Sequence, residues 1–427
     1  MLVLGLVLPL ALCLWFWLRA LNQTPTVSIP TPTMPTPNAR DYYIAASNAV
    51  LDERKIEVAR IPGNAAGRPS DSPTPPSLAD KEKLVAENAG AVQLLHQGFQ
   101  YPYQEPPSRS FNTAFPHYQK IRALARFLSL QAQVEVEKGD AGGATGASLD
   151  AIQMGETMPR GGPLIGMLVG AACQAIGRKQ AWQAAGHLDA AQARAAARRL
   201  EIIRAGHVPF ADTMQEEEWC TQAGLLEKMR QRGWPGNIGT FTGDASNILP
   251  TQMLLIRCRL SGKRNIMSNY TRYMDQATAN ARQPYTAHPA APDVPEGPIN
   301  QFLLPVFNQA RLREVDASTQ NALLLVTLAL RAYRLDHGAY PPTLAALAPR
   351  YLHAVPTDPF ALSGPLRYKR TGTSYVLYSV GPDGKDDGGM AIFDRTLHTP
   401  TTPEANDRRH EVQENSQGDI VAGVNIS

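Results

Sequence analysis

A charge-free apolar run at the N-terminus constrains this chain more than any other feature. The run covers residues 2–18 and reads LVLGLVLPLALCLWFWL. As a helix rising ~1.5 Å per residue it spans ~26 Å, slightly less than the ~30 Å hydrocarbon core of a bilayer. Trp15 and Trp17 lie near one end, where aromatic side chains line membrane interfaces. We therefore expect residues 1–21 to form a transmembrane anchor.

Two other readings of the run stay open, a cleaved signal peptide and a buried helix of a soluble protein. A signal peptide carries a basic stretch before the apolar run and a small-x-small cleavage site, and neither is seen before Arg19. A lipoprotein signal needs a small residue before Cys13, where Leu12 stands. The residues favour the uncleaved anchor.

Residues 22–38 form a Thr/Pro-rich linker that contains TPTVSIPTPTMPTPN. This composition favours an extended, semi-rigid spacer, as is common between a membrane and an exported domain. Arg19 follows the apolar run and weakly favours the opposite, cytoplasmic orientation. We give the spacer more weight, and expect a single-pass protein of the cell membrane with most of the chain extracytoplasmic.

Residues 39–283 read as an α-helical domain, because apolar residues recur at helical spacing. The expected helices are 41–56, 78–97, 115–138, 141–157, 163–185, 189–206, 210–232 and 247–280. Glycine pairs at 142–143 and 161–162 are expected to separate antiparallel helical hairpins. The expected fold class of the whole chain is α+β, with this domain mostly α-helical.

Composition and motifs exclude several functions. Lys and Arg number 41 against 38 acidic residues, which is too balanced for an obligate nucleic-acid binder. The sequence contains no G-x-G-x-x-G, Walker A, H-E-x-x-H, G-x-S-x-G or C-x-x-C motif. Glu216–Glu218 is the densest acidic spot of the helical part, and we read it as a solvated helix turn. We expect no catalytic residue and no nucleic-acid partner.

A second linker and a C-terminal module complete the chain. Residues 284–299 are proline-rich, with PYTAHPAAPDVPEGP at 284–298. A long helix is expected from about Pro305 to about Asp336, at the start of a module that covers residues 300–427. Gln320 and Asn321 interrupt its apolar stripe, so it is amphipathic and not a second membrane span.

Short motifs follow this helix in a specific order. Y-P-x-x-L begins at Tyr340, and V-P-T-D-P-F covers residues 355–360. Short strands are expected at 366–368 and 375–378, and S-V-G-P-D-G covers 379–384. This order resembles the periplasmic module of the major pseudopilin of type II secretion systems. The resemblance covers about a fifth of the chain and implies a long helix followed by a small antiparallel sheet.

The resemblance also implies a structural calcium site. In that family the loop after the second strand holds a calcium ion. Carried over by motif, the ligands are Asp383, Asp386 and Asp387, with Asp419 after an insertion. Carboxylate oxygens are the ligands that calcium prefers. The competing interpretation is that D-G-K-D-D-G-G forms only a polar turn.

The N-terminus departs from the family pattern. Pseudopilins begin with a short basic leader and a G-F-T-L-I-E-type sequence cut by a prepilin peptidase, which MLVLGLVLPLALCLW lacks. We therefore do not expect this chain to polymerise as a filament subunit. We expect a structural or interaction role at the cell envelope, with envelope or secretion-machinery proteins as partners. The alternative is an exported enzyme with its site near Glu216–Trp219 or Tyr42–Tyr43.

Overall fold

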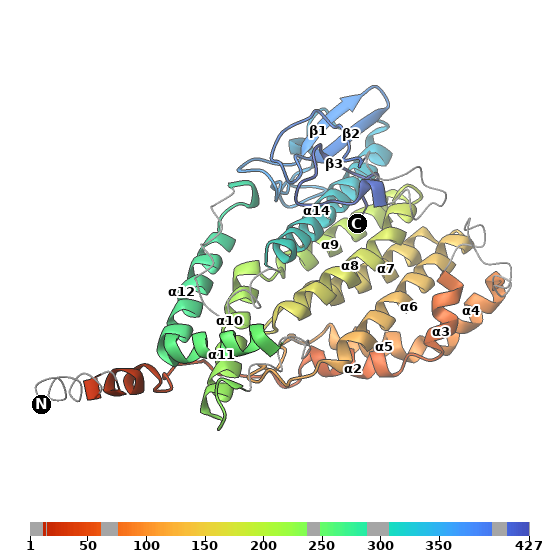
Figure 1. Cartoon of the computed structure of the whole chain (residues 1–427). Helices are drawn as coiled ribbons and strands as arrows, with labels where there is room; N and C mark the ends of the chain where they lie inside the picture. Colours follow the sequence, from red (N-terminus) through yellow and green to blue (C-terminus); the bar gives the residue numbers. More distant parts are fainter. Residues whose placement is uncertain are drawn as a thin grey trace, which may run out of the picture.

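The computed structural model describes residues 12–13, 15–60, 76–236, 248–287, 307–394 and 408–426, with only the backbone described for 248–254. Figure 1 shows long helices side by side, with a small antiparallel sheet at one end of the molecule. This arrangement confirms the expected α+β class. The helices are α2 (Ala39–Asn48), α3 (Glu53–Arg60), α4 (Leu78–Glu87), α5 (Ala89–Gly98), α6 (Pro116–Lys138), α7 (Ala141–Thr157), α8 (Leu164–Ala185), α9 (Ala190–Ala205), α10 (Phe210–Arg230), α11 (Ile248–Ser261), α12 (Lys263–Ala281) and α14 (Phe307–His337).

The predicted helices from α6 to α10 are confirmed to within two residues at each end. Asp189 caps α9, since its side chain accepts a hydrogen bond from the backbone nitrogen of Gln192 at 2.8 Å. One prediction within this region was wrong. Gly142 and Gly143 lie in the first turn of α7, and the chain instead reverses at Gly139, which ends α6 in the left-handed conformation at φ 80°.

Three predicted helices are each broken into two, giving the pairs α2–α3, α4–α5 and α11–α12. The breaks lie at Asp52 (φ 57°), Asn88 and Gly262 (φ 77°). Asn88 is buried, and its side chain accepts a hydrogen bond from Leu51 N at 2.7 Å and donates one to Leu84 O at 2.9 Å. Hydrophobic periodicity continues across such breaks, so the pattern alone does not reveal them.

Helices α6, α7 and α8 pack on one another as successive hairpins. Gly155 on α7 faces Gly170 on α8 so closely that a Cβ on either would collide with the carbonyl oxygen of the other. Only glycine permits this backbone approach. The glycines of this Ala/Gly-rich stretch therefore bring α7 and α8 into close contact.

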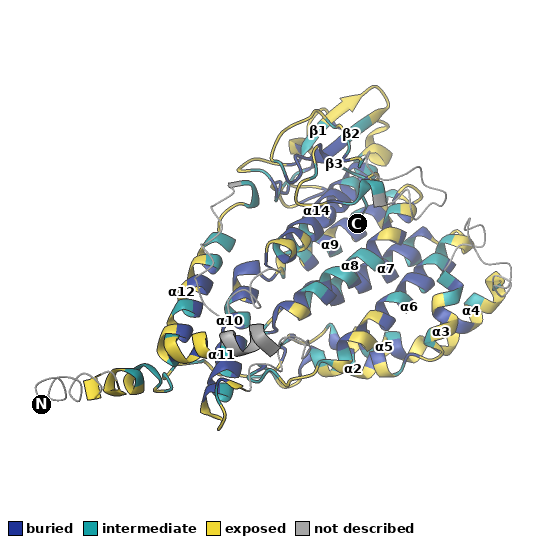
Figure 2. Cartoon of the chain, in the orientation of Figure 1, coloured by how far each residue is buried: buried dark blue, intermediate teal, exposed yellow. Residues whose placement is uncertain are grey.

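Helix α14 packs between the helical bundle and the sheet. It contacts α8 and α9 on one side and β2 on the other, and most of its apolar residues are buried (Figure 2). Leu149 of α7, Leu200 of α9, Leu330 of α14 and Leu377 of β2 all belong to one hydrophobic cluster. The predicted boundary at 284–299 therefore lies between segments that share a core.

The sheet has the order β1 (Arg367–Thr371), β2 (Ser374–Ser379) and β3 (Ile420–Val421), with both pairs antiparallel. Tyr368 pairs with Leu377, and Tyr378 pairs with Val421. Between α14 and the sheet, the short helix η3 (Leu344–Leu347) packs back on α14, as the Y-P-x-x-L motif predicts. A second short helix, η4 (Arg408–His410), precedes β3. A long helix followed by a small antiparallel sheet is thus present.

The two predicted linkers lie partly against the body of the protein. In the tract 22–38, Val27 and Ile29 pack on the hydrophobic cluster formed by α10, α12 and the start of α14. Residues 285–287 form the short helix η2 (Tyr285–Ala287), whose Tyr285 ring lies 5.1 Å from that of Phe360, and residues 288–299 fall outside the described part.

Residues 1–11 and 14 of the predicted anchor also lie outside the described residues, and residues 15–21 are helical. Within the described ranges, no helix combines the length and the apolar character that crossing a membrane requires.

Candidate functional site

The four predicted metal ligands lie in the loop after β2 or beside it. Asp383, Asp386 and Asp387 belong to that loop, and Asp419 immediately precedes β3. The Asp419 carboxylate is buried and accepts hydrogen bonds from the backbone nitrogens of Gly389 at 2.7 Å and Asp387 at 3.3 Å. Its backbone nitrogen donates to Met390 O at 2.7 Å. The fold therefore brings Asp419 beside Asp387, which is about thirty residues earlier in the chain.

The other carboxylates of the loop have separate partners. Asp386 Oδ1 accepts hydrogen bonds from the Tyr378 hydroxyl at 2.9 Å and from Gly388 N at 3.0 Å. Arg367 Nε lies 3.4 Å from Asp386 Oδ2. Asp383 Oδ1 accepts from Lys385 N at 3.1 Å, which closes a turn within the loop. Asp386 and Asp387 are thus near Asp419, whereas Asp383 stabilises its own turn.

We call Asp383, Asp386 and Asp387, together with the adjacent Asp419, the acidic loop. Asp419 is the carboxylate of this loop that is costly to ionise. Burial, with a smaller contribution from the Asp386 and Asp387 carboxylates, raises the pKa of Asp419 to about 6, against two backbone N–H bonds that lower it. Asp386 behaves in the opposite way, because the Gly388 N–H, the Tyr378 hydroxyl and Arg367 lower its pKa. A cation beside Asp419 would remove the repulsion.

These residues fit calcium by ligand type, since all four candidates are carboxylates. Within the described residues, however, no three His, Cys, Asp or Glu side chains are arranged to hold a metal ion. A shared ligand set would require Asp386 to turn away from Tyr378 and Arg367. Calcium binding stays a prediction.

Asp358 of the D-P turn is hydrogen-bonded to residues at the start of the same loop. Its buried carboxylate accepts hydrogen bonds from Phe360 N at 3.0 Å, Ser379 Oγ at 2.6 Å and Val380 N at 3.0 Å. The predicted capping of backbone N–H groups by this side chain is confirmed. The same contacts explain why D-P and S-x-G occur together, because one carboxylate joins the two motifs.

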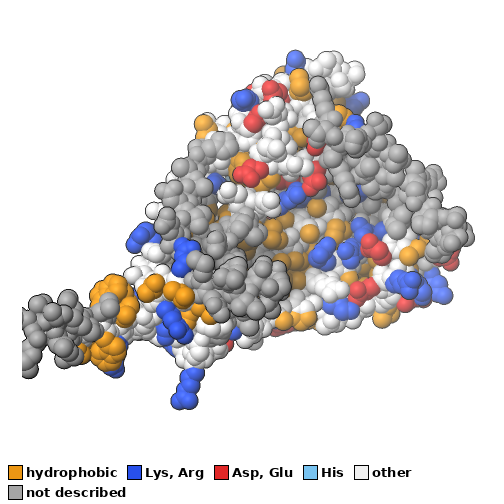
Figure 3. Space-filling view, viewed as in Figure 1, with side chains coloured by type: hydrophobic (Ala, Val, Ile, Leu, Met, Phe, Trp, Pro, Cys, Tyr) orange, Lys and Arg blue, Asp and Glu red, His pale blue; other side chains and the backbone are white. Residues whose placement is uncertain are grey.

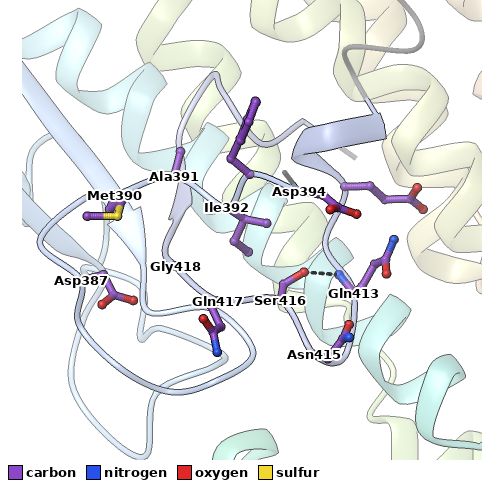
Figure 4. Close-up of a pocket in the computed structure, with 12 residues that line it drawn as sticks. Asp387, Met390, Ala391, Ile392, Asp394, Gln413, Asn415, Ser416, Gln417 and Gly418 are labelled. Atoms are coloured by element: carbon purple, nitrogen blue, oxygen red, sulfur yellow. Dashed lines mark hydrogen bonds between the residues drawn. The ribbon is translucent and has the colours of Figure 1, made fainter. Parts of the chain in front are cut away.

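A hollow of about 790 Å³ lies beside the acidic loop (Figure 4). Segments 387–394 and 411–418 line it, and Gln413 N donates to Ser416 Oγ at 2.9 Å at its edge. Asp387, Asp394 and Glu411 add carboxylates to the lining.

A second polar cluster, which the sequence analysis missed, lies where α14 packs on α7 and α8. We call it the α14 cluster; its members are Glu156, Gln174, Arg178, His207, Glu314 and Asn321. His207, in the loop between α9 and α10, has Nδ1 at 2.6 Å from Glu156 and Nε2 at 2.9 Å from Glu314. Asn321 receives a hydrogen bond from Arg178 Nη1 at 3.1 Å and donates one to Gln174 at 2.8 Å.

In the α14 cluster, positive and negative side chains lie close to one another. Burial opposes the charged form of His207, yet the hydrogen bonds to Glu156 and Glu314 raise its pKa to about 10. Burial outweighs the opposing effect of the Asp316 and Glu156 carboxylates and lowers the pKa of Arg178 to about 10. The buried carboxylates therefore have cations beside them. The one signal in the sequence was Gln320 and Asn321, two amides in an otherwise apolar stripe.

Glu216–Glu218 is not the solvated turn that we predicted. Glu216 and Glu218 are buried, and Glu216 pairs with Arg109 at 2.5 Å. Glu217 accepts a hydrogen bond from Leu164 N at 2.8 Å and thereby caps the start of α8. Burial, together with the nearby Asp275 carboxylate, raises the pKa of Glu218 to about 7. The prediction failed because α10 is covered by α8 and α12, which spacing within α10 does not show.

The other site proposed for an enzyme, Tyr42–Tyr43, is a packing contact. Tyr43 is buried and its hydroxyl lies 3.2 Å from Thr157 Oγ1. Tyr42 stacks on Tyr101 with ring centroids 5.2 Å apart.

No protein-family model, curated protein or solved structure matches this chain. The pseudopilin resemblance therefore depends on the motifs quoted above.

Proposed function

We propose that this chain is a membrane-anchored extracytoplasmic protein whose pseudopilin-like C-terminal part has a structural or interaction role at the cell envelope. The apolar run at residues 2–18 and the ordered motifs from Tyr340 to Gly384 support this proposal. We include calcium, held by Asp386, Asp387, Asp419 and Asp383, as a structural ion of that part. The expected partners are envelope or secretion-machinery proteins.

The observation that carries the proposal is the position of α14. Its apolar face is occupied by α8 and α9, and the sheet packs beside it. A helix covered in this way does not offer its apolar face to equivalent helices of other copies. The observation favours an individual anchored protein over a filament subunit.

An exported enzyme is the second candidate, because Glu156, His207 and Glu314 converge in the α14 cluster. Both ring nitrogens of His207 face carboxylates, which is the arrangement of a doubly protonated imidazolium. Such a ring has no free lone pair for a general base, and a pKa of about 10 makes it a weak acid. The hollow beside it is about 20 Å³, which accommodates a single water molecule. This geometry favours a structural brace.

The test is membrane fractionation of the full chain and of two double variants. L6R/L10R places two charges in the apolar run, and T31R/T33R places the same charges in the spacer. We expect the parent and T31R/T33R to stay with membranes after carbonate washing, and L6R/L10R to be released. Protease added outside the inner membrane should cut the parent beyond Asn22.

Release of the parent by carbonate, or full protection from that protease, contradicts the proposal. Affinity capture from solubilised membranes then tests the partner class. L6R/L10R serves as its background control, and envelope or secretion proteins should be enriched with the parent alone.

A further inference from the structure

The structure joins the end of the N-terminal helix to the turn between α11 and α12. Gly262, at φ 77°, lies against Leu21, and a Cβ at this glycine would be 2.7 Å from Leu21 Cβ. Asn22 Nδ2 donates to Arg259 O at 3.3 Å, and Lys263 Nζ donates to Thr24 Oγ1 at 3.3 Å. The apolar run ends at Leu18, only three residues before Leu21. The α11–α12 turn is therefore held beside the end of the run.

Helix α11 exposes apolar side chains at this position. Ile256 is 57% exposed and Leu260 is 61% exposed, whereas Cys258 between them is buried. Trp15, Phe16 and Trp17 of the N-terminal helix are exposed as well. Figure 3 shows apolar side chains on both sides of the join between this helix and the body of the protein. Large apolar side chains that gather in this way mark an interaction surface.

Basic side chains surround these apolar ones. Arg257, Arg259 and Arg264 are exposed on α11 and α12, and Arg19 is exposed with its guanidinium 5.1 Å from the Trp15 ring. The end of α10 adds the exposed Arg230, and Lys263 links α12 to that end through Met229 O at 2.5 Å. The surface thus combines exposed apolar and cationic side chains.

We propose that α11 lies in the membrane interface and contacts anionic phospholipid beside the anchor. This inference rests on the proposed anchoring of residues 1–21, which brings Leu21, and with it Gly262, to the bilayer surface. A helix with apolar and basic side chains on its outer face binds there by burying the apolar ones ~5–10 Å deep. Each nearby Lys or Arg adds electrostatic attraction to an anionic leaflet.

The contact would also set the orientation of the protein. A lone anchor with a flexible spacer leaves a domain free to rotate. Here the anchor end and α11 touch the same bilayer, and α11 is continuous with α12, which packs on α10. Two contacts at the membrane would hold the helical bundle at a fixed angle to it.

The test uses the full chain reconstituted in vesicles that contain equal parts of phosphatidylcholine and phosphatidylglycerol. A fluorescent label is attached at L260C, with Cys13 and Cys220 changed to serine, and brominated lipid serves as the quencher. The matched control is I202C, because Ile202 is 75% exposed on α9. We expect brominated lipid to remove most of the emission at 260 and none at 202. R257E/R259E should reduce the quenching at 260, and R198E on α9 should not.

The outcomes separate this inference from the anchoring. A chain that floats with vesicles after carbonate washing, but whose label at 260 is no more quenched than at 202, overturns the α11 contact and leaves the anchor in place. A chain that does not float overturns both. Equal quenching in pure phosphatidylcholine overturns the role of anionic lipid.

Discussion

The α14 cluster and the acidic loop both bring carboxylates together, but they compensate them differently. In the α14 cluster, Glu156 lies against His207 at 2.6 Å and near the buried Arg178. In the acidic loop, the Asp419 carboxylate accepts hydrogen bonds from two backbone N–H groups, while Asp386 and Asp387 repel it. The α14 cluster places cations beside its buried carboxylates, whereas the Arg367 cation of the acidic loop lies beside the more exposed Asp386.

This difference indicates different roles. A buried carboxylate with a cation beside it is stable at neutral pH and acts as a permanent joint between helices. A buried carboxylate among like charges is stabilised by protonation or by an added cation. The α14 cluster should therefore hold the fold together under ordinary conditions, whereas the loop should respond to pH and to calcium.

The largest effect should come from removing the buried cation of the α14 cluster. Arg178→Met leaves Glu156 and Asp316 without it, and loss of one partner of a buried pair costs about 3–5 kcal/mol. Equilibrium unfolding in urea measures the change. Arg198→Met, at an exposed position of α9, is the control and should change stability by less than ~0.5 kcal/mol. Equal effects of the two variants would show that the cluster is not an internal joint.

Calcium should stabilise the acidic loop next most strongly. At a hundredfold excess over its dissociation constant, an ion bound only by the folded state adds ~2.7 kcal/mol. Hydrogen exchange of residues 383–392 in the full chain should slow with calcium and recover with chelator. Asp419→Asn and Asp383→Ala should remove the difference, and Asp394→Asn should not. If calcium does not change the hydrogen exchange of these residues in the parent, the loop is only a polar turn.

The response of the loop should also depend on pH. The folded pKa of Asp419, about 6, is above the ordinary value of 3.8, so its protonated form favours the folded state. That stabilisation is complete below the ordinary value and is lost as pH rises through about 6. Calcium protection should therefore be larger above pH 6 than near pH 4, and a pH-independent effect would place the ion elsewhere.

A smaller effect is expected for the bridge that His207 makes to α14. A double-mutant cycle of His207→Gln and Glu314→Gln should give a coupling of about 1–2 kcal/mol at neutral pH. The folded pKa is raised, so the contribution of His207 is complete below 6.5 and is lost as pH rises through about 10. His207→Gln should flatten the stability profile in that window. An additive cycle would show that the ring is not shared between the two carboxylates.

The smallest effect should come from the exposed pair Arg313–Glu411, which are 2.8 Å apart between α14 and the segment before β3. Surface pairs of this kind contribute ~0–1 kcal/mol. Glu411→Gln should therefore change the urea midpoint far less than any variant in the α14 cluster. If Glu411→Gln lowers the urea midpoint as much as the α14-cluster variants do, the expected difference between buried and exposed charge pairs is wrong.

Sequence patterns predicted where helices and turns form more accurately than they predicted how these elements pack on one another. The ends of α6 to α10, the long helix, η3 and the D-P turn follow from local spacing and turn chemistry, and all are present. The breaks at Asp52 and Asn88 were missed because they depend on contacts with distant residues. Only Gly262 carried a local signal, since glycine adopts positive φ readily.

The polar residues of the candidate sites show the same difference between what local sequence spacing predicts and what only tertiary contacts reveal. Asp383, Asp386 and Asp387 were predicted as ligands because they are close in sequence within a family motif, and the motif order suggested Asp419 with them. The α14 cluster was missed because its members come from α7, α8, α14 and the loop after α9, and no spacing rule joins those positions. Asn321 was noted as a break in an apolar stripe, but its partners follow only from tertiary structure.

The late position of α14 in the chain has a consequence for biosynthesis. Helices α8 and α9 leave the ribosome first, and the helix that covers their apolar face follows roughly a hundred residues later, about 5–20 s at usual rates of synthesis. During that interval a nascent bundle presents Leu200 and its neighbours to solvent. A chain that terminates early, or that is clipped before Phe307, keeps this face uncovered permanently. Chaperones and proteases would then recognise the unfinished protein by the apolar surface that α14 normally covers.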